Sequence, residues 1–259
     1  MFSTLEYGRE GAIAVVRLNR PAKLNAIDAA MVRELRELAD VLRADAALRA
    51  LVITGNGRAF SAGADIAALA ELAGPPDFLR FIEEIQATFT AIEDLGIPTI
   101  AALNGLAYGG GCELALACDL RVMAEDATIG VPEIKIGVLP GAGGTQRLAR
   151  LLPPAVALEM ICFGEPLGSQ PALHHGLVNR VVPRERVVDV ALAMARQLAE
   201  LPPLALRSAK LLVHVGMNAD LKTGIEAERQ AVAFLFGTAD RNEGMQAFLD
   251  KRAASFAGR

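Results

Sequence analysis

The sequence predicts an α/β protein with a helical C-terminal part. Short runs of β-branched and apolar residues, such as AIAVVRL at 12–18 and RALVITG at 49–55, alternate with longer stretches of helical periodicity. Such alternation is typical of buried strands that are connected by helices. Beyond Pro183 the periodicity is almost wholly helical. We therefore expect residues 1–183 to form an α/β core and residues 184–259 to form a helical region.

The first third of the chain predicts strand, helix and strand in turn. The strand at 12–18 ends at the turn-forming NRP. Asp28 then stands where a helix N-cap would be, before apolar residues at helical spacing as far as Leu42. After the strand at 49–55 comes the loop NGRAFSAGADI. Helical sequence follows, is broken at GPP (74–76), and resumes from about 77 to 95.

The remainder of the chain predicts further short strands and then helices alone. PTIAAL reads as a strand, and the glycine run after it leads into a helix that begins near Cys112. DLRVMAED and ATIG predict two more short strands. Helical segments are expected near 184–201, 203–216, 219–236 and 239–253, with no linker and no low-complexity tract between them.

Composition and charge exclude several classes of partner. The 259 residues carry a formal net charge of −4, so there is no general field that would gather nucleic acid or anionic lipid. The N-terminus lacks a basic segment followed by an apolar stretch and a small-residue cleavage site. The uncharged run at 96–112 contains Pro98, Asn104 and five glycines, so it predicts a strand, a loop and a helix start rather than a membrane span. We expect a cytoplasmic protein with no nucleic-acid or membrane partner.

Neither the cysteines nor the histidines predict a metal site. Cys112, Cys118 and Cys162 have apolar neighbours and no CxxC spacing, so we expect reduced thiols in the core. His174 and His175 have no Cys, Asp or Glu at ligand spacing. We assign the two histidines no catalytic role.

Three consecutive glycines, 109 to 111, fall at the predicted junction of a strand and a helix. Unpaired N–H groups at a helix N-terminus point outward, and the absence of Cβ atoms lets another molecule approach the backbone. This geometry would bind an oxyanion. A tight turn that needs positive φ explains an isolated GGG equally well.

Two carboxylates lie beside glycine-rich turns in apolar surroundings. Glu113 belongs to the first turn of the helix after the glycines, and Glu133 lies 20 residues further on in GVPEIKIG. Desolvation would raise the pKa of such carboxyl groups toward the range that is useful in proton transfer. The pair could be a general acid and a general base, although Glu113 alone could be a simple N-terminal helix charge.

A second turn of small residues, FSAGADI at 60–66, precedes another predicted helix. Its backbone N–H groups could point at the same site, whereas an ordinary capped helix start would need only Asp65. Two turns with exposed N–H groups and two semi-buried glutamates suggest proton chemistry beside a stabilised oxyanion such as an enolate. The residues alone do not name a substrate.

These motifs, in this order, resemble the enoyl-CoA hydratase (crotonase) family. The similarity runs through nearly the whole chain and is most specific in its centre. The matching segments are LNRPAKLNAI (18–27), FSAGADI (60–66), the stretch from IAALNGLAYGGG to GGTQRLARLL (100–152), GLVNRVVP (176–183) and EGMQAFLDKR (243–252).

The resemblance implies a crotonase-type spiral of ββα repeats with a C-terminal helical trimerisation region, assembled as a homo-trimer or a homo-hexamer. The ligand would be an acyl-CoA thioester, with no metal or redox cofactor. By the family motif, the N–H groups of Ala64 and Gly110 form an oxyanion hole, and Glu113 and Glu133 flank a water. Since both acids are present, the favoured reaction is hydration of a trans-2-enoyl-CoA to a 3-hydroxyacyl-CoA.

The resemblance also suggests where coenzyme A would bind. Its adenine would lie beside the backbone of the SAGAD turn, with Ala62, Asp65 and Ile66 as substrate-binding candidates. Arg20 and Lys23 are candidate phosphate ligands, and Lys251 would act on the ligand of a neighbouring subunit. Each of these three cations could instead be a solvated surface charge.

Other activities on the same scaffold remain open. An isomerase or another crotonase-type acyl-CoA lyase is the main alternative, and an RNA-binding member of the fold is a third. An RNA binder should show a basic helix with interleaved aromatics, but the helix at 28–43 mixes acids and arginines. Val131 replaces a glutamine of well-known hydratases, and residues 69–81 are idiosyncratic, so the sequence does not set the acyl chain length.

Overall fold

The computed structural model describes residues 2–259, and its core is a six-stranded sheet. Five neighbouring strands are parallel, and β1 pairs antiparallel with β2 at one edge. The spatial order is β1 (Leu5–Glu10), β2 (Ile13–Leu18), β3 (Ala50–Gly55), β5 (Thr99–Leu103), β7 (Leu120–Ala124) and β10 (Arg180–Val182). The prediction of short buried strands is confirmed for β2, β3, β5 and β7.

A smaller second sheet is built from the continuations of these strands. Its order is β4 (Ala59–Ser61), β6 (Leu106–Tyr108), β8 (Thr128–Gly130) and β9 (Leu167–Gly168). The chain passes from β3 into β4, from β5 into β6 and from β7 into β8, and each pair is followed by helical structure. Every repeat thus adds one parallel strand to each sheet, which confirms the predicted spiral of ββα repeats.

Helices cover the sheets, and most of them are short. The longest in this part of the chain, α1 (Ala29–Ala44) and α3 (Pro75–Glu93), pack against each other. The others are α2 (Ile66–Ala70), α4 (Gly110–Leu116), α5 (Gly144–Leu151), α6 (Pro154–Phe163) and α7 (Ser169–His174), with 3-10 turns η1 (Pro21–Lys23), η2 (Pro132–Ile136) and η3 (Arg184–Arg186).

The start of α1 shows how a local signal sets an element. The side chain of Asp28 accepts a hydrogen bond from the N–H of Met31 at 2.9 Å, so the predicted N-cap is confirmed. Met31 and Leu35 are then buried, one turn apart, on the face that meets the core.

In contrast, the sequence does not predict the strand β1. Its sequence, LEYGRE, is mostly polar, and only the antiparallel pairing with β2 makes it a strand.

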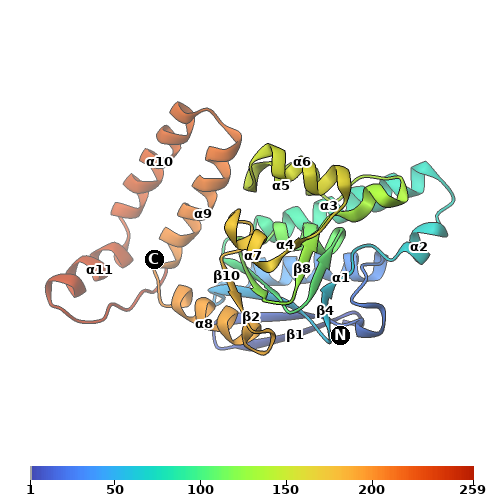
Figure 1. Cartoon of the computed structure of the whole chain (residues 1–259). Helices are drawn as coiled ribbons and strands as arrows, with labels where there is room; N and C mark the ends of the chain where they lie inside the picture. Colours follow the sequence, from blue (N-terminus) through green and yellow to red (C-terminus); the bar gives the residue numbers. More distant parts are fainter. Residues whose placement is uncertain (1) are drawn as a thin grey trace.

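The C-terminal helices separate into one that belongs to the sheet and three that project from it. The helix α8 (Val187–Ala199) packs on β2, β3, β5 and β7. Beyond it, α9 (Pro203–Asn218), α10 (Leu221–Phe236) and α11 (Ala239–Leu249) form an arm that extends away from the α/β part (Figure 1). Their bounds lie close to the predicted segments, with α11 ending four residues earlier than expected.

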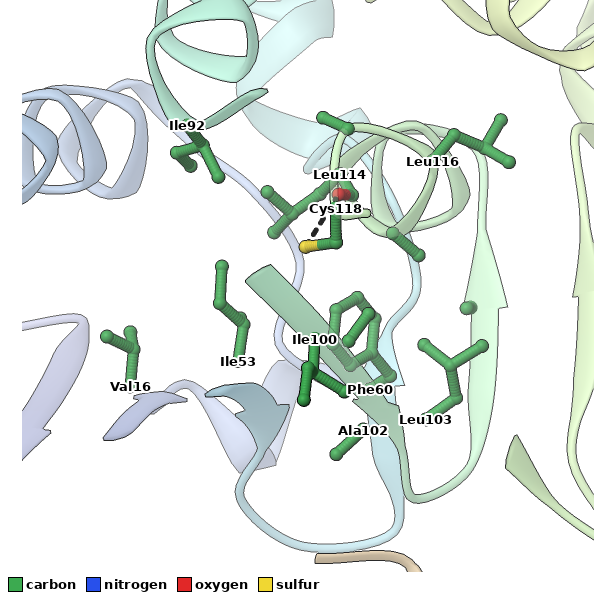
Figure 2. Close-up of a cluster of buried hydrophobic side chains, with 14 of the residues drawn as sticks. Val16, Ile53, Phe60, Ile92, Ile100, Ala102, Leu103, Leu114, Leu116 and Cys118 are labelled. Atoms are coloured by element: carbon green, nitrogen blue, oxygen red, sulfur yellow. Dashed lines mark hydrogen bonds between the residues drawn. The ribbon is translucent and has the colours of Figure 1, made fainter. Parts of the chain in front are cut away.

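The hydrophobic core fills the space between the sheets and helices. Phe60, from β4, is completely buried and points into a cluster with Ile100 and Leu103 of β5 (Figure 2). Ile53 of β3 and Leu114 of α4 belong to the same cluster, Ile53 beside Ile100 and Leu114 above it in the view of Figure 2. Truncation of a core aromatic such as Phe60 to Ala typically costs about 3–5 kcal/mol, so this cluster is a main source of stability.

One expectation about the cysteines is wrong. Cys112 and Cys118 are buried free thiols, as expected, but Cys162 is exposed. It lies near the end of α6, a surface helix whose outer side also carries apolar residues. Apolar neighbours in sequence therefore do not place a residue in the core here.

No described helix is long and apolar enough to cross a membrane.

Candidate active site

Three turns meet at one edge of the smaller sheet. The strands β4, β6 and β8 are parallel neighbours, so their C-terminal ends lie side by side. Each strand leads into a segment of interest: 62–65 after β4, 109–113 after β6, and 131–133 after β8. The carboxyl ends of parallel strands are a common place for ligand sites in α/β proteins. The fold thus brings together turns whose segments begin at residues 62, 109 and 131 of the chain.

The first two turns approach each other closely because both contain glycine. Gly63 has φ +92°, and a Cβ atom built there would lie 2.6 Å from the carbonyl oxygen of Tyr108 and 3.2 Å from the nitrogen of Gly110. A Cβ atom at Gly110 would lie 3.6 Å from the nitrogen of Ala64. Within residues 2–259, neither of these two N–H groups donates a hydrogen bond to the protein. The N–H groups of Ala64 and Gly110 are therefore adjacent and available to a ligand.

The glycine run also makes room for the second carboxylate. Gly109 has φ +50° and ψ −123°, and a Cβ atom there would lie 2.7 Å from Oε1 of Glu133. At Gly111, a Cβ atom would lie 2.5 Å from the carbonyl oxygen of Ser61, because α4 begins against β4. The turn with positive φ is thus confirmed at Gly109, and the run also packs closely against β4 and Glu133. Binding of an oxyanion by the run stays a prediction.

Glu113 is buried at the start of α4, with only 2% of its surface exposed. Its Oε1 accepts hydrogen bonds from the N–H groups of Ala142 and Gly144, both at 2.7 Å. Burial raises the pKa of this carboxyl to about 7, and the charge of Glu133 adds to the rise, while the two N–H donors oppose it. A group with such a pKa exchanges protons near neutral pH.

Glu133 is half-buried at the start of η2, directly after Pro132. Its Oε2 is enclosed and accepts no hydrogen bond from the described part of the chain. Burial raises the pKa of this carboxyl above its ordinary value. An enclosed carboxyl oxygen without a protein partner is available for a ligand or a water.

Arg121 fixes the helix that carries Glu113. Its guanidinium is buried and donates to the carbonyl oxygens of Ala115 and Cys118, at 3.2 and 2.7 Å, where α4 ends. A third bond, to the carbonyl of Leu177 at 2.6 Å, ties this end of α4 to the segment before β10. A cation at the C-terminus of a helix satisfies orphan carbonyls and suits the helix dipole.

Asp65 pairs with the two cations predicted as phosphate ligands. Its Oδ2 lies 3.0 Å from both Arg20 Nη2 and Lys23 Nζ, and these hydrogen bonds, that of Lys23 first, lower the pKa of Asp65 to about 2. Asp65 occupies the N-cap position of α2 without a side-chain cap hydrogen bond. Asp65 therefore does not cap α2 with its side chain. Instead it joins the FSAGADI turn to Arg20 and Lys23 of the segment LNRPAKLNAI.

The remaining candidates lie in different elements of the fold. Ala62 is in the turn after β4, and its N–H donates to the carbonyl of Leu24 at 2.9 Å. Ile66 begins α2 and is exposed. Lys251 follows α11, on the arm that projects from the core (Figure 1). His174 and His175 stack edge to face at the end of α7, and no group of three or more potential metal ligands occurs within residues 2–259.

Sequence reasoning missed the turn that supplies both donors to Glu113. Ala142 lies just before α5 and Gly144 is its first residue, in the segment GAGGTQRL. The two glycines at 143 and 144 were the available signal, but nothing local indicates that their turn meets α4. Only the packing of α5 against α4 brings the turn to the carboxylate.

The fold and the site define a protein class: a spiral α/β protein with two adjacent N–H donors beside one buried and one half-buried carboxyl group. The sequence model described as "Enoyl-CoA hydratase/isomerase" matches residues 8–259. The chain belongs to this family.

Curated relatives and solved structures agree with this assignment. The chain is 40% identical to the 2,3-dehydroadipyl-CoA hydratase of Escherichia coli, over 99% of this chain and all of that protein. It is 38% identical to the crotonyl-CoA hydratase of Syntrophomonas wolfei, over 96% of this chain and 95% of that protein. The crystal structure of an enoyl-CoA hydratase from Bacillus anthracis matches with a TM-score of 0.96 at 37% identity, covering 99% of this chain and 100% of that one. These neighbours establish the crotonase-type fold.

Proposed function

We propose that the protein is an enoyl-CoA hydratase, which adds water reversibly across the 2,3 double bond of a trans-2-enoyl-CoA to give a 3-hydroxyacyl-CoA. The observation that carries this proposal is the pair of carboxyl groups, Glu113 and Glu133, both with raised pKa, beside two free N–H donors. Hydration requires one group to take a proton from water and another to give a proton to carbon. Relatives named as hydratases at 38–40% identity support the same reaction.

The backbone donors would act on the thioester carbonyl. The N–H groups of Ala64 and Gly110 hydrogen-bond the carbonyl oxygen, which draws electrons from the double bond and makes C3 electrophilic. As the enolate forms, the same donors stabilise its negative oxygen. Each such donor is typically worth about 3–4 kcal/mol of barrier. This arrangement needs no metal or redox cofactor, and we propose that none takes part.

The two glutamates would divide the proton transfers. Glu113, ionised, takes a proton from water as the water oxygen bonds to C3, and the π electrons move to form the enolate. Glu133, protonated, then gives its proton to C2 as the carbonyl re-forms. The product contains the substrate plus one water. A proton passes from Glu113 back to Glu133 through solvent before the next cycle, so the carboxyls form one coupled system.

Coenzyme A would lie along the turn after β4. The backbone at Ala62 would meet the adenine, and Asp65 and Ile66 would border the substrate. Lys23 pairs with Asp65 at 3.0 Å, but its side chain is 58% exposed, so a phosphate could also contact it. Arg20 is only 16% exposed and also pairs with Asp28 at 3.0 Å, so it would act mainly by holding the turn. Lys251 would reach the ligand of a neighbouring copy.

We further propose a homo-trimer or homo-hexamer in the cytoplasm. Apolar side chains on the arm of α9 to α11 support self-association, since Leu221 is 79% and Phe248 83% exposed in the single chain. The negative net charge and the mixture of acids and arginines in the helix α1 argue against a nucleic-acid partner.

The test is the loss of the enoyl-thioester absorbance when crotonyl-CoA is added to the wild type and to the variants Glu113→Gln and Glu133→Gln. We expect rapid loss with the wild type and a decrease of roughly 10² to 10⁴ in kcat for each variant, because a positioned acid or base contributes about that much. Glutamine keeps the size of the side chain and removes its proton chemistry.

Folding of each variant is checked by circular dichroism, and product is identified as 3-hydroxybutyryl-CoA. A wild type that binds CoA yet leaves crotonyl-CoA intact would reject short-chain hydration. Assays with 3-enoyl and aromatic acyl thioesters would then decide for an isomerase or another lyase.

A further inference from the structure

Arg147 links three parts of the molecule behind the candidate site. Its side chain is 14% exposed. The guanidinium forms two hydrogen bonds with Glu93, the last residue of α3: Nε donates to Oε1 at 3.1 Å and Nη2 to Oε2 at 2.5 Å. The third nitrogen, Nη1, donates to the carbonyl oxygen of Ala142 at 3.1 Å. A two-point Arg–carboxylate pair is rigid and directional, so it fixes the guanidinium relative to α3.

The residue that Arg147 holds is also a partner of Glu113. Ala142 gives its carbonyl to Arg147 and its N–H to Oε1 of Glu113 at 2.7 Å. Gly144, two residues on, gives the second N–H to the same oxygen. The turn Ala142–Gly144 therefore connects the guanidinium of Arg147 to the carboxylate of Glu113 through hydrogen bonds of its backbone.

The shape of this turn depends on the guanidinium as well. Gly143 lies between the two donors with φ +107°, a conformation that favours glycine. A Cβ atom at Gly143 would collide with Nη1 of Arg147. The turn therefore folds directly around the arginine, and this observation is independent of the hydrogen bonds.

We propose that Arg147 is a positioning residue: held by Glu93, it fixes the turn Ala142–Gly144 and so aims the carboxylate of Glu113 at the reacting water. The inference rests on the proposed hydration for its catalytic meaning, although the clamp itself does not depend on it. The charged or titratable groups that act on Glu113 are Glu133 from η2, Arg147 from α5 and the neighbouring thiol of Cys112. Arg147 is the cation among them, and it lowers the pKa of Glu113 against the effect of burial.

The test replaces Arg147 by Met, which keeps the length of the side chain and removes its charge and donors. The first measurement is the titration of the Glu113 carboxyl in the ligand-free protein, by isotope-edited infrared spectroscopy, with Glu113→Gln to assign the band. We expect its midpoint to move upward, because a nearby cation and two fixed donors are lost or loosened.

The second measurement is the pH profile of crotonyl-CoA hydration. We expect kcat to fall on the order of 10- to 100-fold with little change in KM, as for a misplaced catalytic group. The acid limb of the profile should move to higher pH, so the loss is larger at pH 6 than at pH 9. Arg147→Lys keeps the positive charge but cannot pair with Glu93 through two nitrogens. Its Glu113 midpoint should therefore lie closer to the wild-type value than its kcat does.

Two further variants keep the test decisive. Glu93→Gln loosens the clamp while Arg147 remains, so it should produce a weaker change in the same direction even if Arg147→Met does not fold. Arg184→Met is the matched control, since Arg184 also joins a carboxylate, Asp126 at 2.8 Å, to a backbone carbonyl, that of Asn104 at 2.5 Å, away from Glu113.

An unchanged Glu113 midpoint and an unchanged kcat in folded Arg147→Met and Glu93→Gln would overturn the proposal. Equal effects from Arg184→Met would also overturn it, by showing a general loss of rigidity. A wild type that hydrates no enoyl-CoA, together with the expected shift of the Glu113 midpoint, would reject the reaction and leave the positioning of Glu113 by Arg147 standing.

Discussion

Glu113 carries a cost in stability that follows from its burial. Its folded pKa is about 7, whereas an unperturbed Glu titrates near 4.5. Between these two values the unfolded chain has lost the proton and the folded chain still holds it. Stability therefore falls as pH rises from about 4.5 to about 7 and then levels off. This sign is opposite to that of a carboxylate stabilised by ion pairs.

Glu113→Gln should remove this pH dependence. Glutamine has no proton to lose, and its amide oxygen can still accept from Ala142 and Gly144. We expect the variant to be more stable than the wild type at pH 8 by up to about 3 kcal/mol and nearly equal to it at pH 4.5. Urea unfolding at the two pH values measures the difference. A gap that does not grow with pH would contradict the raised pKa.

Gly109 gives a second prediction for a single residue. Gly109→Ala adds strain at φ +50° and a Cβ atom 2.7 Å from Oε1 of Glu133, so the carboxyl must move. We expect hydration to fall about 10²-fold or more, since small misplacements of reacting groups have effects of that size. The protein should remain folded, with a loss of about 1–3 kcal/mol from the strained backbone.

Gly176→Ala is the matched control for this change. Gly176 has φ +76°, but a Cβ atom there meets nothing within 4 Å. Both variants should lose stability, as measured by thermal unfolding, while only Gly109→Ala loses activity. Equal activities in the two variants would mean that Glu133 adapts without consequence.

At the scale of elements, the sequence predicts best what is locally determined. Asp28 and the apolar spacing after it are enough to place α1, and the small-residue turns after β4 and β6 follow from glycine geometry. The strand β1 is missed because its stability comes from pairing with β2. The donors to Glu113 are missed for the same reason: α5 meets α4 through packing between distant segments.

The attachment of α9 to the α/β part is a further element-scale feature. Lys210 is 10% exposed, lies 2.8 Å from Oδ2 of Asp119 and donates to the carbonyl of Ile97 at 3.1 Å. The same Asp119 oxygen also accepts from the N–H and the hydroxyl of Thr99, at 2.7 and 2.9 Å. This network joins the first helix of the arm to the ends of β5 and α4.

Lys210→Met should loosen α9 without unfolding the core. Losing the cation leaves the Asp119 carboxylate partly buried with fewer partners, at a cost of about 1–3 kcal/mol. Hydrogen exchange should speed up in 203–218 and remain unchanged in β3 and β5, whereas Lys222→Met, at an exposed lysine of α10, should alter neither. If exchange at 203–218 were as slow in Lys210→Met as in the wild type, other contacts would hold α9.

At the scale of the whole molecule, the spiral explains why the candidate residues could be recognised together. Each repeat ends one strand of the smaller sheet at the same edge, so three separate turns meet at one place. The sequence contains the turns and the acids, and the resemblance supplies their register. The sequence does not indicate the pairing of Asp65 with Arg20 and Lys23 or the exposure of Cys162, because both depend on which surfaces face each other after folding.

The arm shows a surface that the single chain leaves uncovered. On α10, the exposed side chains of Leu221, Ile225, Val232 and Phe236 recur on one side of the helix at helical spacing. An apolar stripe of this kind on a projecting helix favours association with another copy. The proposed trimer or hexamer would bury this stripe, and it would also bring Lys251 toward a neighbouring copy.

Val232→Asp should weaken that assembly because it places a charge within the stripe, where burial without a partner is unfavourable by several kcal/mol. Val41→Asp is the matched control, since Val41 is similarly exposed, at 52% against 58%, but lies on α1 of the α/β part. Sedimentation velocity at micromolar concentration should give an assembled wild type and Val41→Asp, and smaller species for Val232→Asp with unchanged circular dichroism. A monomeric wild type would reject the assembly, and an intact Val232→Asp assembly would move the interface away from α10.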